Sequence, residues 1–229
     1  MKADAKKEQQ ETNVPVGTRI QREIIAWFWV ALAFLLINGT IGQARVIPSG
    51  SMQNTLLIGD HLLMSRLGYD AGIPFTNLHV PLWRNPHRQQ MIIFRPPFNP
   101  RGEDLVKRVI GMPGDTLDIR DGAVWINGAK LDESYALGPT EPLELNVPYK
   151  VPDNCYFVMG DNRGNSYDSR LWGCLPHENL IGTPVLIYMS LDASPQAWES
   201  GHLGDRLGAY LNAVVHPGTV RWRRLFHFF

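Results

Sequence analysis

The sequence predicts a mainly antiparallel β domain that follows a single membrane-spanning helix. Residues 24–44 contain no charged side chain. Short apolar or alternating runs recur through residues 45–195 without strong helical periodicity. The 21 glycines and 17 prolines are spread along all 229 residues, as in turn-rich β proteins. Together these features indicate a curled sheet or a partial barrel behind one membrane helix.

The membrane helix is predicted over residues 24–44, which read "IIAWFWVALAFLLINGTIGQA". As a helix this stretch would be about 31 Å long, close to the thickness of a hydrocarbon core. Trp27 and Trp29 lie near one end, where indole rings favour the membrane interface. A removable signal peptide is the alternative, because the run ends in the small residue of "GQA". A long charged leader and the Trp-rich run favour the membrane helix.

Cationic residues predict how this helix is oriented. Arg45 alone follows the helix closely, whereas five cations precede it: Lys2, Lys6, Lys7, Arg19 and Arg22. The positive-inside rule then places the N-terminus in the cytoplasm. The predicted organisation is a cytoplasmic polar leader at 1–23, a transmembrane helix at 24–44, an extracytoplasmic β domain at 45–195 and a C-terminal tail at 196–229.

The β domain is predicted from strand-like runs separated by turn residues. These runs are residues 61–67, 90–96, 104–112, 116–121, 123–127, 155–161 and 183–190. The dipeptides Asp121-Gly122 and Asn127-Gly128 predict a tight meander over 116–132. One short helix is expected over 206–215. The segment 220–229, "VRWRRLFHFF", is expected either at a membrane interface or as a terminus packed on the sheet.

Composition limits the class of function. The chain has 22 cationic and 22 acidic residues, which argues against a nucleic-acid partner. Its two cysteines, Cys155 and Cys174, are too few for a disulfide scaffold, and no Cys-x-x-Cys or His–Cys cluster suggests a metal. In an oxidising compartment the two could pair, and two free buried thiols are the alternative. No metal and no cofactor are expected.

Two serines in "PSGSM", residues 48–52, raise the possibility of a serine nucleophile, which needs a base. None of the seven histidines lies in a distinctive motif. A lysine can serve when burial lowers its pKa from about 10.4. Lys130 follows an Asn-Gly turn and Lys150 lies in "VPYKVP", so both are expected to be exposed. Lys107 alone lies in an apolar strand, "LVKRVIGM". Lys107 is therefore the candidate base, and a solvent-facing lysine with a charge partner is the alternative.

Three motifs occur in a characteristic order: "PSGSM" at 48–52, "KRVIGMPGD" at 107–115 and "GDNRGNSYDSR" at 160–170. Together they resemble bacterial type I signal peptidase, the leader peptidase family of Ser–Lys proteases, over roughly residues 24–195. The resemblance implies a membrane-anchored serine endopeptidase on a β fold. Its partners would be the lipid bilayer and secretory preproteins, whose N-terminal signal peptides are cut after small residues. Its place would be the outer face of the cell (inner or plasma) membrane.

The resemblance also implies roles for individual residues. Ser51 matches the nucleophile and Lys107 the general base. The main-chain N–H of Ser51 and the hydroxyl of Ser49 would form the oxyanion hole, whose donors meet the charge that develops during acyl transfer. Ser166 matches a serine whose hydroxyl orients the lysine amine.

Charged and apolar residues would support this centre. Asp168 and Arg170 resemble a supporting ion pair, and Asp161 and Arg163 would brace the same loop. A turn held by surface salt bridges is the alternative for all four. Shallow apolar walls would select small substrate residues, and the residues expected there, each of which could also be ordinary core, are Ile47, Pro48, Met52, Leu105 and Val106.

The chain departs from the family pattern at two motifs. Gln89 and Gln90 stand where the family often has "GD", and Gly164 stands where it often has Asp. The segment 116–154 is short, so the second β domain of some members is expected to be reduced or missing. Two other functions remain open: a specialised pilin- or conjugation-type maturation peptidase with the same mechanism, and an inactive membrane-tethered β binding module.

Overall fold

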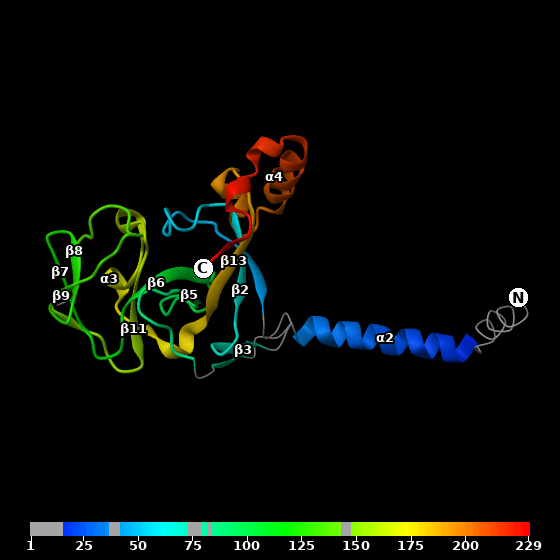
Figure 1. Cartoon of the computed structure of the whole chain (residues 1–229), viewed down its shortest axis with the longest axis horizontal. Coiled ribbons are helices and arrows are strands. Elements are labelled where there is room, and N and C mark those ends of the chain that lie inside the picture. The colour runs from blue at the N-terminus through cyan, green and yellow to red at the C-terminus, as the bar shows by residue number, and fades with distance from the viewer. Residues whose placement is uncertain (1–15, 37–41, 73–78, 82–83, 143–147) are drawn as a thin grey trace, which may run out of the picture.

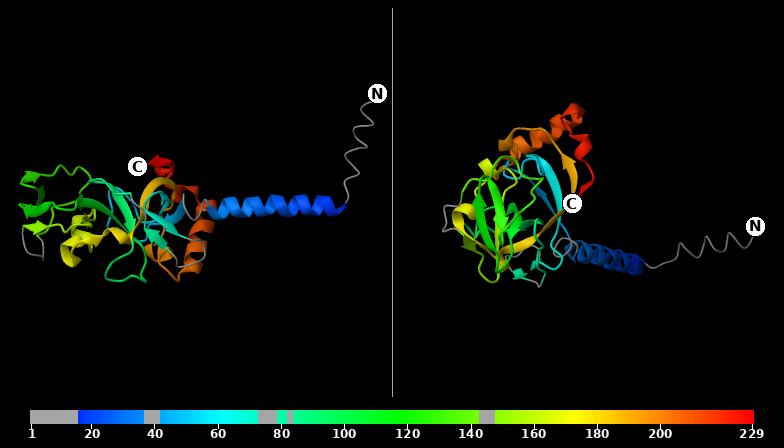
Figure 2. Two further views of the ribbon diagram at one scale, coloured as in Figure 1. Left: turned by 90° about the horizontal axis from the view of Figure 1, so that it is seen from below. Right: turned by 60° about the vertical axis from the view of Figure 1, so that its left-hand side comes forward.

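A computed structural model describes residues 16–36, 42–72, 79–81, 84–142 and 148–229. One long helix, α2, extends away from a β domain, and Figures 1 and 2 show it projecting from the same end of that domain in every view. The β domain holds a large curled sheet beside a small second sheet, which lies at the end farthest from α2.

The large sheet is antiparallel throughout and contains eight strands. Its order is β1-β2-β13-β5-β6-β11-β12, and β14 pairs with β13 outside this path. The strands are β1 Gln43–Val46, β2 Asp60–Ser65, β5 Met91–Phe94, β6 Leu105–Gly111, β11 Cys155–Met159, β12 Leu175–Pro176, β13 Leu180–Ser190 and β14 His227–Phe228. The predicted antiparallel, mainly β fold is confirmed.

The curl of this sheet comes from the long strand β13. Its first residues pair with β5, and the stretch from Thr183 to Ser190 pairs with β2, with register shifts along the way. Gly182 stands at the change of partner, where an added Cβ would lie 2.3 Å from the carbonyl oxygen of Ser65. Only glycine therefore allows β13 to pass so close to the end of β2.

The small sheet has the order β10-β7-β8-β9, and a separate hairpin joins β3 to β4. The strands are β7 Thr116–Arg120, β8 Ala123–Ile126, β9 Ala129–Lys130, β10 Tyr149–Lys150, β3 Asp70–Gly72 and β4 His79–Pro81. The Asp121-Gly122 and Asn127-Gly128 turns adopt the positive φ values of tight hairpins. The meander predicted over 116–132 is confirmed.

Helices are few in the described chain. The longer ones are α2 Val16–Leu36 and α4 Leu203–Val215, and α3 Ser169–Trp172 is a single turn. The 3₁₀ helices are η2 Arg163–Asn165, η3 His177–Asn179, η4 Pro195–Trp198, η5 Pro217–Thr219 and η6 Trp222–Arg224. The helix expected over 206–215 is present and begins three residues earlier.

The bounds predicted for the membrane helix, 24–44, are wrong. The helix runs from Val16 to Leu36, and residues 37–41 lie outside the described chain. Gln43 and Ala44 belong to β1, where they pair with Met64 and Leu63. The last two residues of the predicted span are therefore part of the sheet and not of the helix. Within the part of the chain that is described, no helix has both the length and the apolar character that crossing a membrane requires.

The core of the β domain is built around β5 and β6, which are neighbours inside the large sheet. Strand β5 is buried along its whole length, and Val109 and Ile110 of β6 are fully buried.

Cys155 of β11 forms a disulfide with Cys174, which precedes β12, with 5.6 Å between the Cα atoms. This bond ties together the two ends of the segment that contains the "GDNR" motif. The sequence left open a disulfide or two free buried thiols, and the structure has the disulfide.

Candidate active site

Ser51 lies in a tight turn directly after the extended segment that follows β1. Main-chain hydrogen bonds from Gln53 to Gly50 and from Leu56 to Met52 close this turn. Met52 and Leu56 are buried and hold the turn against the sheet. The carbonyl oxygen of Ser51 accepts a hydrogen bond of 3.0 Å from the N–H of Asn162. The "PSGSM" and "GDNR" motifs are therefore in direct contact.

Lys107 extends from β6 to the Ser51 hydroxyl. Its side chain is 3% exposed, and the Nζ to Oγ distance is 2.5 Å. Alternation along β6 directs the neighbouring Arg108 to the other face of the sheet. The structure thus joins the two residues that match the catalytic pair, which are 56 residues apart in the chain.

Burial lowers the pKa of Lys107 to about 8. Removal of the ammonium from water is the main cause, and the positive charge of Arg170 acts in the same direction. The carboxylates of Asp168 and Asp161 oppose this shift. A substantial fraction of Lys107 is therefore neutral at mildly alkaline pH, as a general base requires.

Ser49 and Ser166 occupy different positions relative to this pair. The Ser49 hydroxyl lies 3.5 Å from that of Ser51, at the mouth of the site. The Ser166 hydroxyl is buried and has no hydrogen-bond partner in the described chain, so the structure does not join it to the Lys107 amine as expected. It points instead toward Gly160, where an added Cβ would lie 2.3 Å from Ser166 Oγ and 2.5 Å from the Ser51 carbonyl oxygen.

Asp168 and Arg170 form the buried ion pair that their motif suggested. Two guanidinium nitrogens of Arg170 contact the two carboxylate oxygens at 2.8 and 2.9 Å. The same carboxylate accepts the N–H of Gly160 at 2.9 Å, and Arg170 also donates to the carbonyl of Arg163. This pair is not a surface salt bridge, because both side chains are at most 5% exposed.

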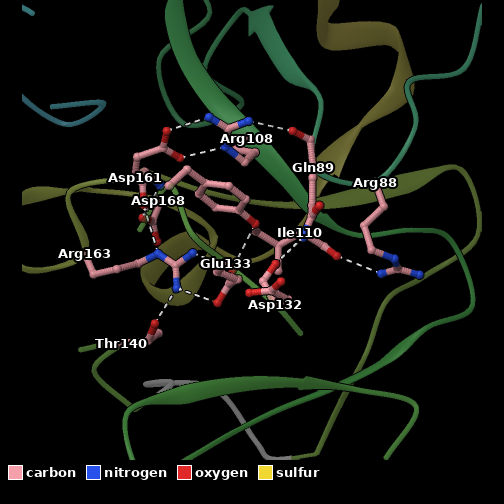
Figure 3. A network of polar contacts seen from close by, with 12 residues as sticks. Arg88, Gln89, Arg108, Ile110, Asp132, Glu133, Thr140, Asp161, Arg163 and Asp168 are labelled. Carbon is pink, nitrogen blue, oxygen red and sulfur yellow. Dashed lines mark hydrogen bonds and ion pairs between the residues drawn. The ribbon is translucent and has the colours of Figure 1, made fainter. Parts of the chain in front are cut away.

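Asp161 and Arg163 brace the loop through separate partners (Figure 3). Asp161 is held by the guanidinium of Arg108 through contacts of 2.6 and 2.8 Å. Arg163 pairs with Glu133 at 2.5 Å and donates to Thr140. These bonds tie the "GDNR" loop to β6 on one side and to the segment after β9 on the other.

Sequence reasoning missed Arg108, Glu133 and Thr140. Arg108 follows Lys107 in β6, so strand alternation predicts that it points to the opposite face, where it could have supported a second loop. Glu133 and Thr140 come from an irregular segment with no motif, 30 and 23 residues from their partner Arg163. Only the tertiary structure brings them to it.

A cleft of about 460 Å³ opens beside Ser51 and Lys107. All five residues predicted as substrate walls line it: Ile47, Pro48, Met52, Leu105 and Val106. One side of the cleft is β1, which stands at the edge of the sheet, and the other is the start of β6. The residue pairs between β6 and β11 begin at Arg108, so Leu105–Lys107 pair with no described strand on that side.

A family model for signal peptidase, peptidase S26, matches residues 20–189. The chain therefore belongs to the signal peptidase family, peptidase S26. Family membership confirms the signal peptidase activity that the three motifs indicated. Signal peptidases of this family with similar sequences include a probable signal peptidase I-2 of Synechocystis sp., which is 36% identical over 72% of this chain and 78% of its own length.

Further signal peptidases resemble this chain to a similar degree. The signal peptidase I of Leptolyngbya laminosa is 39% identical over 74% of this chain and 75% of its own length. A crystal structure of a signal peptidase I from Enterococcus faecalis V583 matches 44% of this chain and 97% of its own chain, at 35% identity and a TM-score of 0.39.

Proposed function

We propose that this signal peptidase works through a Ser51–Lys107 dyad. The observation that carries the proposal is the contact of 2.5 Å between Ser51 Oγ and a buried lysine amine whose pKa is lowered to about 8. Neutral Lys107 accepts the hydroxyl proton while Ser51 Oγ attacks the scissile carbonyl. The C–N bond then breaks, the proton passes to the leaving amine, and an acyl-enzyme ester remains on Ser51.

Hydrolysis of the ester uses the same base. Neutral Lys107 takes a proton from water, the resulting oxygen attacks the ester carbonyl, and Ser51 regains its proton. The Ser49 hydroxyl and the Ser51 N–H would donate to the oxyanion in both steps. The position of Ser49 at 3.5 Å from Ser51 Oγ supports this role. Gly160 and the Asp168–Arg170 pair would position the Ser51 carbonyl and the lysine.

The cleft suggests how the substrate binds. An extended peptide between β1 and Leu105–Lys107 would meet free main-chain groups on both sides and add a strand to the sheet. Alternate side chains would then point toward the apolar walls around Met52 and Val106. Walls this close to Ser51 favour small residues before the cut.

We further infer that the protein is anchored in the cell membrane with its β domain outside. Helix α2 exposes eight large apolar side chains: Ile20, Ile24, Ile25, Trp27, Phe28, Trp29, Val30 and Phe34. Such a surface is costly in water and favourable in lipid. The cations that precede residue 24 favour a cytoplasmic N-terminus.

The C-terminal tail supports a second contact with the membrane interface. Its terminal strand β14 packs on β13, and Arg221 and Arg224 pair with Asp192 and Asp60 rather than facing outward. The segment also exposes eight large apolar side chains: Leu203, Leu207, Leu211, Val214, Val215, Trp222, Phe226 and Phe228. They would rest on the headgroup region while the arginines hold the tail to the β domain.

Cleavage of preproteins by the purified chain tests the dyad. The Ser51→Ala, Lys107→Met and Lys107→Arg variants are each expected to abolish processing, since arginine keeps its proton and cannot act as the base. Lys130→Met is the matched control, because Lys130 is exposed in β9. Near-normal cleavage by Ser51→Ala or Lys107→Met would overturn the assignment. Cuts confined to one pilin-like substrate would instead favour a specialised maturation peptidase.

A further inference from the structure

The C-terminal segment, residues 190–229, lies beyond the residues that the family model matches, yet it packs against the catalytic sheet. Trp198 is 1% exposed and packs near Val46 of β1. The hydroxyl of Tyr210 in α4 lies 2.8 Å from Nε2 of the buried His61 in β2. Arg224 pairs with the buried Asp60 at 2.6 Å. These contacts fix the segment in place.

This segment forms part of the catalytic cleft. Trp198, Ser200 and Arg206 line the same cleft as Ser51 and Lys107. Ser200 also donates a hydrogen bond to the carboxylate of Glu103, which precedes β6. The C-terminal segment and the start of β6 therefore meet across one end of the cleft and close it.

The register of the two flanking strands indicates which substrate residue reaches that end. Glu103 precedes Lys107 by four residues, and Val46 precedes Ser51 by five. Extended chain advances about 3.3 Å per residue, so the closed end lies roughly 13–17 Å from the dyad. A peptide that adds a strand between β1 and β6 would present there its fourth or fifth residue before the cut.

Arg206 is a cation at this end of the cleft that forms no ion pair within the described residues. Its guanidinium donates to the carbonyls of residues 197, 198 and 199, which fixes its position. No carboxylate in the described chain lies within ion-pair distance of it. The acidic groups at this end have other partners: Glu103 accepts the Ser200 hydroxyl, Asp104 pairs with Arg45, and Asp205 contacts His202.

We propose that Arg206 determines specificity at the fourth or fifth substrate residue before the cut. A carboxylate or another hydrogen-bond acceptor there would satisfy the guanidinium, whereas lysine or arginine would place like charges together in a partly desolvated cleft. The signal peptidase would then select small residues near the dyad and reject cations at the far end. The proposal rests on the Ser51–Lys107 dyad and on the extended binding mode.

A charge-exchange experiment tests the role of Arg206. Peptides with a fixed cleavage site carry Asp, Gln or Lys at the fourth, fifth or sixth residue before the cut, and kcat/KM is measured for each. The wild-type enzyme is expected to favour Asp over Lys about five-fold at the fourth or fifth residue, the scale of one partly exposed ion pair. Arg206→Gln should bring this ratio close to one, and Arg206→Glu should invert it.

The matched control is Arg223→Glu, which makes the same charge change at an exposed position outside the cleft and should keep the wild-type ratio. Each ratio is measured with one enzyme sample, so a loss of folded protein cancels. An Asp-to-Lys ratio that stays the same in wild type, Arg206→Gln and Arg206→Glu would overturn the role of Arg206. A wild-type enzyme that cuts none of the peptides or preproteins would instead refute the proposed dyad.

Discussion

Gly160 gives the sharpest test of how the active site is packed. An added Cβ would lie 2.5 Å from the Ser51 carbonyl oxygen and 2.3 Å from Ser166 Oγ, whereas ordinary contacts begin near 3.4 Å. The Ser166 side chain can rotate away, but the Ser51 carbonyl is main chain held by the Asn162 N–H. Gly160→Ala therefore moves Ser51 by about 1 Å from its present position relative to Lys107.

A shift of that size lengthens the contact of 2.5 Å between Lys107 Nζ and Ser51 Oγ beyond hydrogen-bond distance. We expect kcat/KM for a preprotein to fall about 100-fold. Overpacking is expected to lower the free energy of unfolding by about 1–3 kcal/mol. Steady-state cleavage and urea unfolding measure these two effects on the same sample.

Gly164→Ala provides the matched control, because Gly164 lies in the same loop and an added Cβ there meets no atom within 4 Å. It should retain wild-type kcat/KM and stability. A folded Gly160→Ala enzyme with wild-type kcat/KM would refute the reasoning, because the site would then tolerate displacement of the Ser51 carbonyl.

Three further predictions follow from charge, burial and the disulfide. The value of kcat/KM should rise with pH and reach half its maximum near pH 8, where Lys107 becomes neutral; a profile already flat from pH 6 would contradict this. Arg108→Gln should lower the free energy of unfolding by about 3 kcal/mol, because it leaves the buried carboxylate of Asp161 unpaired. Arg120→Gln is the control, because Arg120 forms an exposed ion pair with Asp118. Urea unfolding should show that it lowers the free energy of unfolding by less than about 1 kcal/mol. Cys155→Ser should cost about 2–4 kcal/mol, and mass mapping without reductant should find Cys155 and Cys174 in one linked peptide.

The strands and the catalytic pair could be predicted from the sequence because their signals are local. Apolar runs with turn residues between them marked β2, β5, β6, β7, β8, β11 and β13. The "PSGSM" motif and the single lysine in an apolar strand indicated Ser51 and Lys107. The structure then shows that β6 brings the Lys107 amine to 2.5 Å from the Ser51 hydroxyl.

The partners that support the site could not be predicted, because they depend on contacts between distant segments. Arg108 meets Asp161 across 53 residues, and no spacing rule connects them. The bounds of α2 were wrong for a different reason. Hydropathy marks apolar residues, but the helix includes the polar stretch that begins at Val16, and Gln43 and Ala44 at the end of the apolar run pair with β2.

The cleft shows the same division between local and distant signals. Ile47 and Met52 flank Ser51 in the sequence, so their place in the cleft wall could be expected. Arg206 comes from a helix 155 residues further along the chain than Ser51, in a segment that the motifs do not reach. Its place in the cleft depends on the contacts of Trp198 and Tyr210 with the sheet.

Direct detection of the acyl-enzyme tests the central claim most directly. The wild-type enzyme is mixed with a slowly hydrolysed peptide ester at pH 8, where a large fraction of Lys107 is neutral and can activate Ser51. The reaction is quenched with acid, and digested fragments are then analysed by mass spectrometry. The account predicts an acyl group on Ser51, and none on any residue of Lys107→Met. An acyl group on Ser49, or one on Ser51 that forms at the wild-type rate in Lys107→Met, would contradict the Ser51–Lys107 dyad.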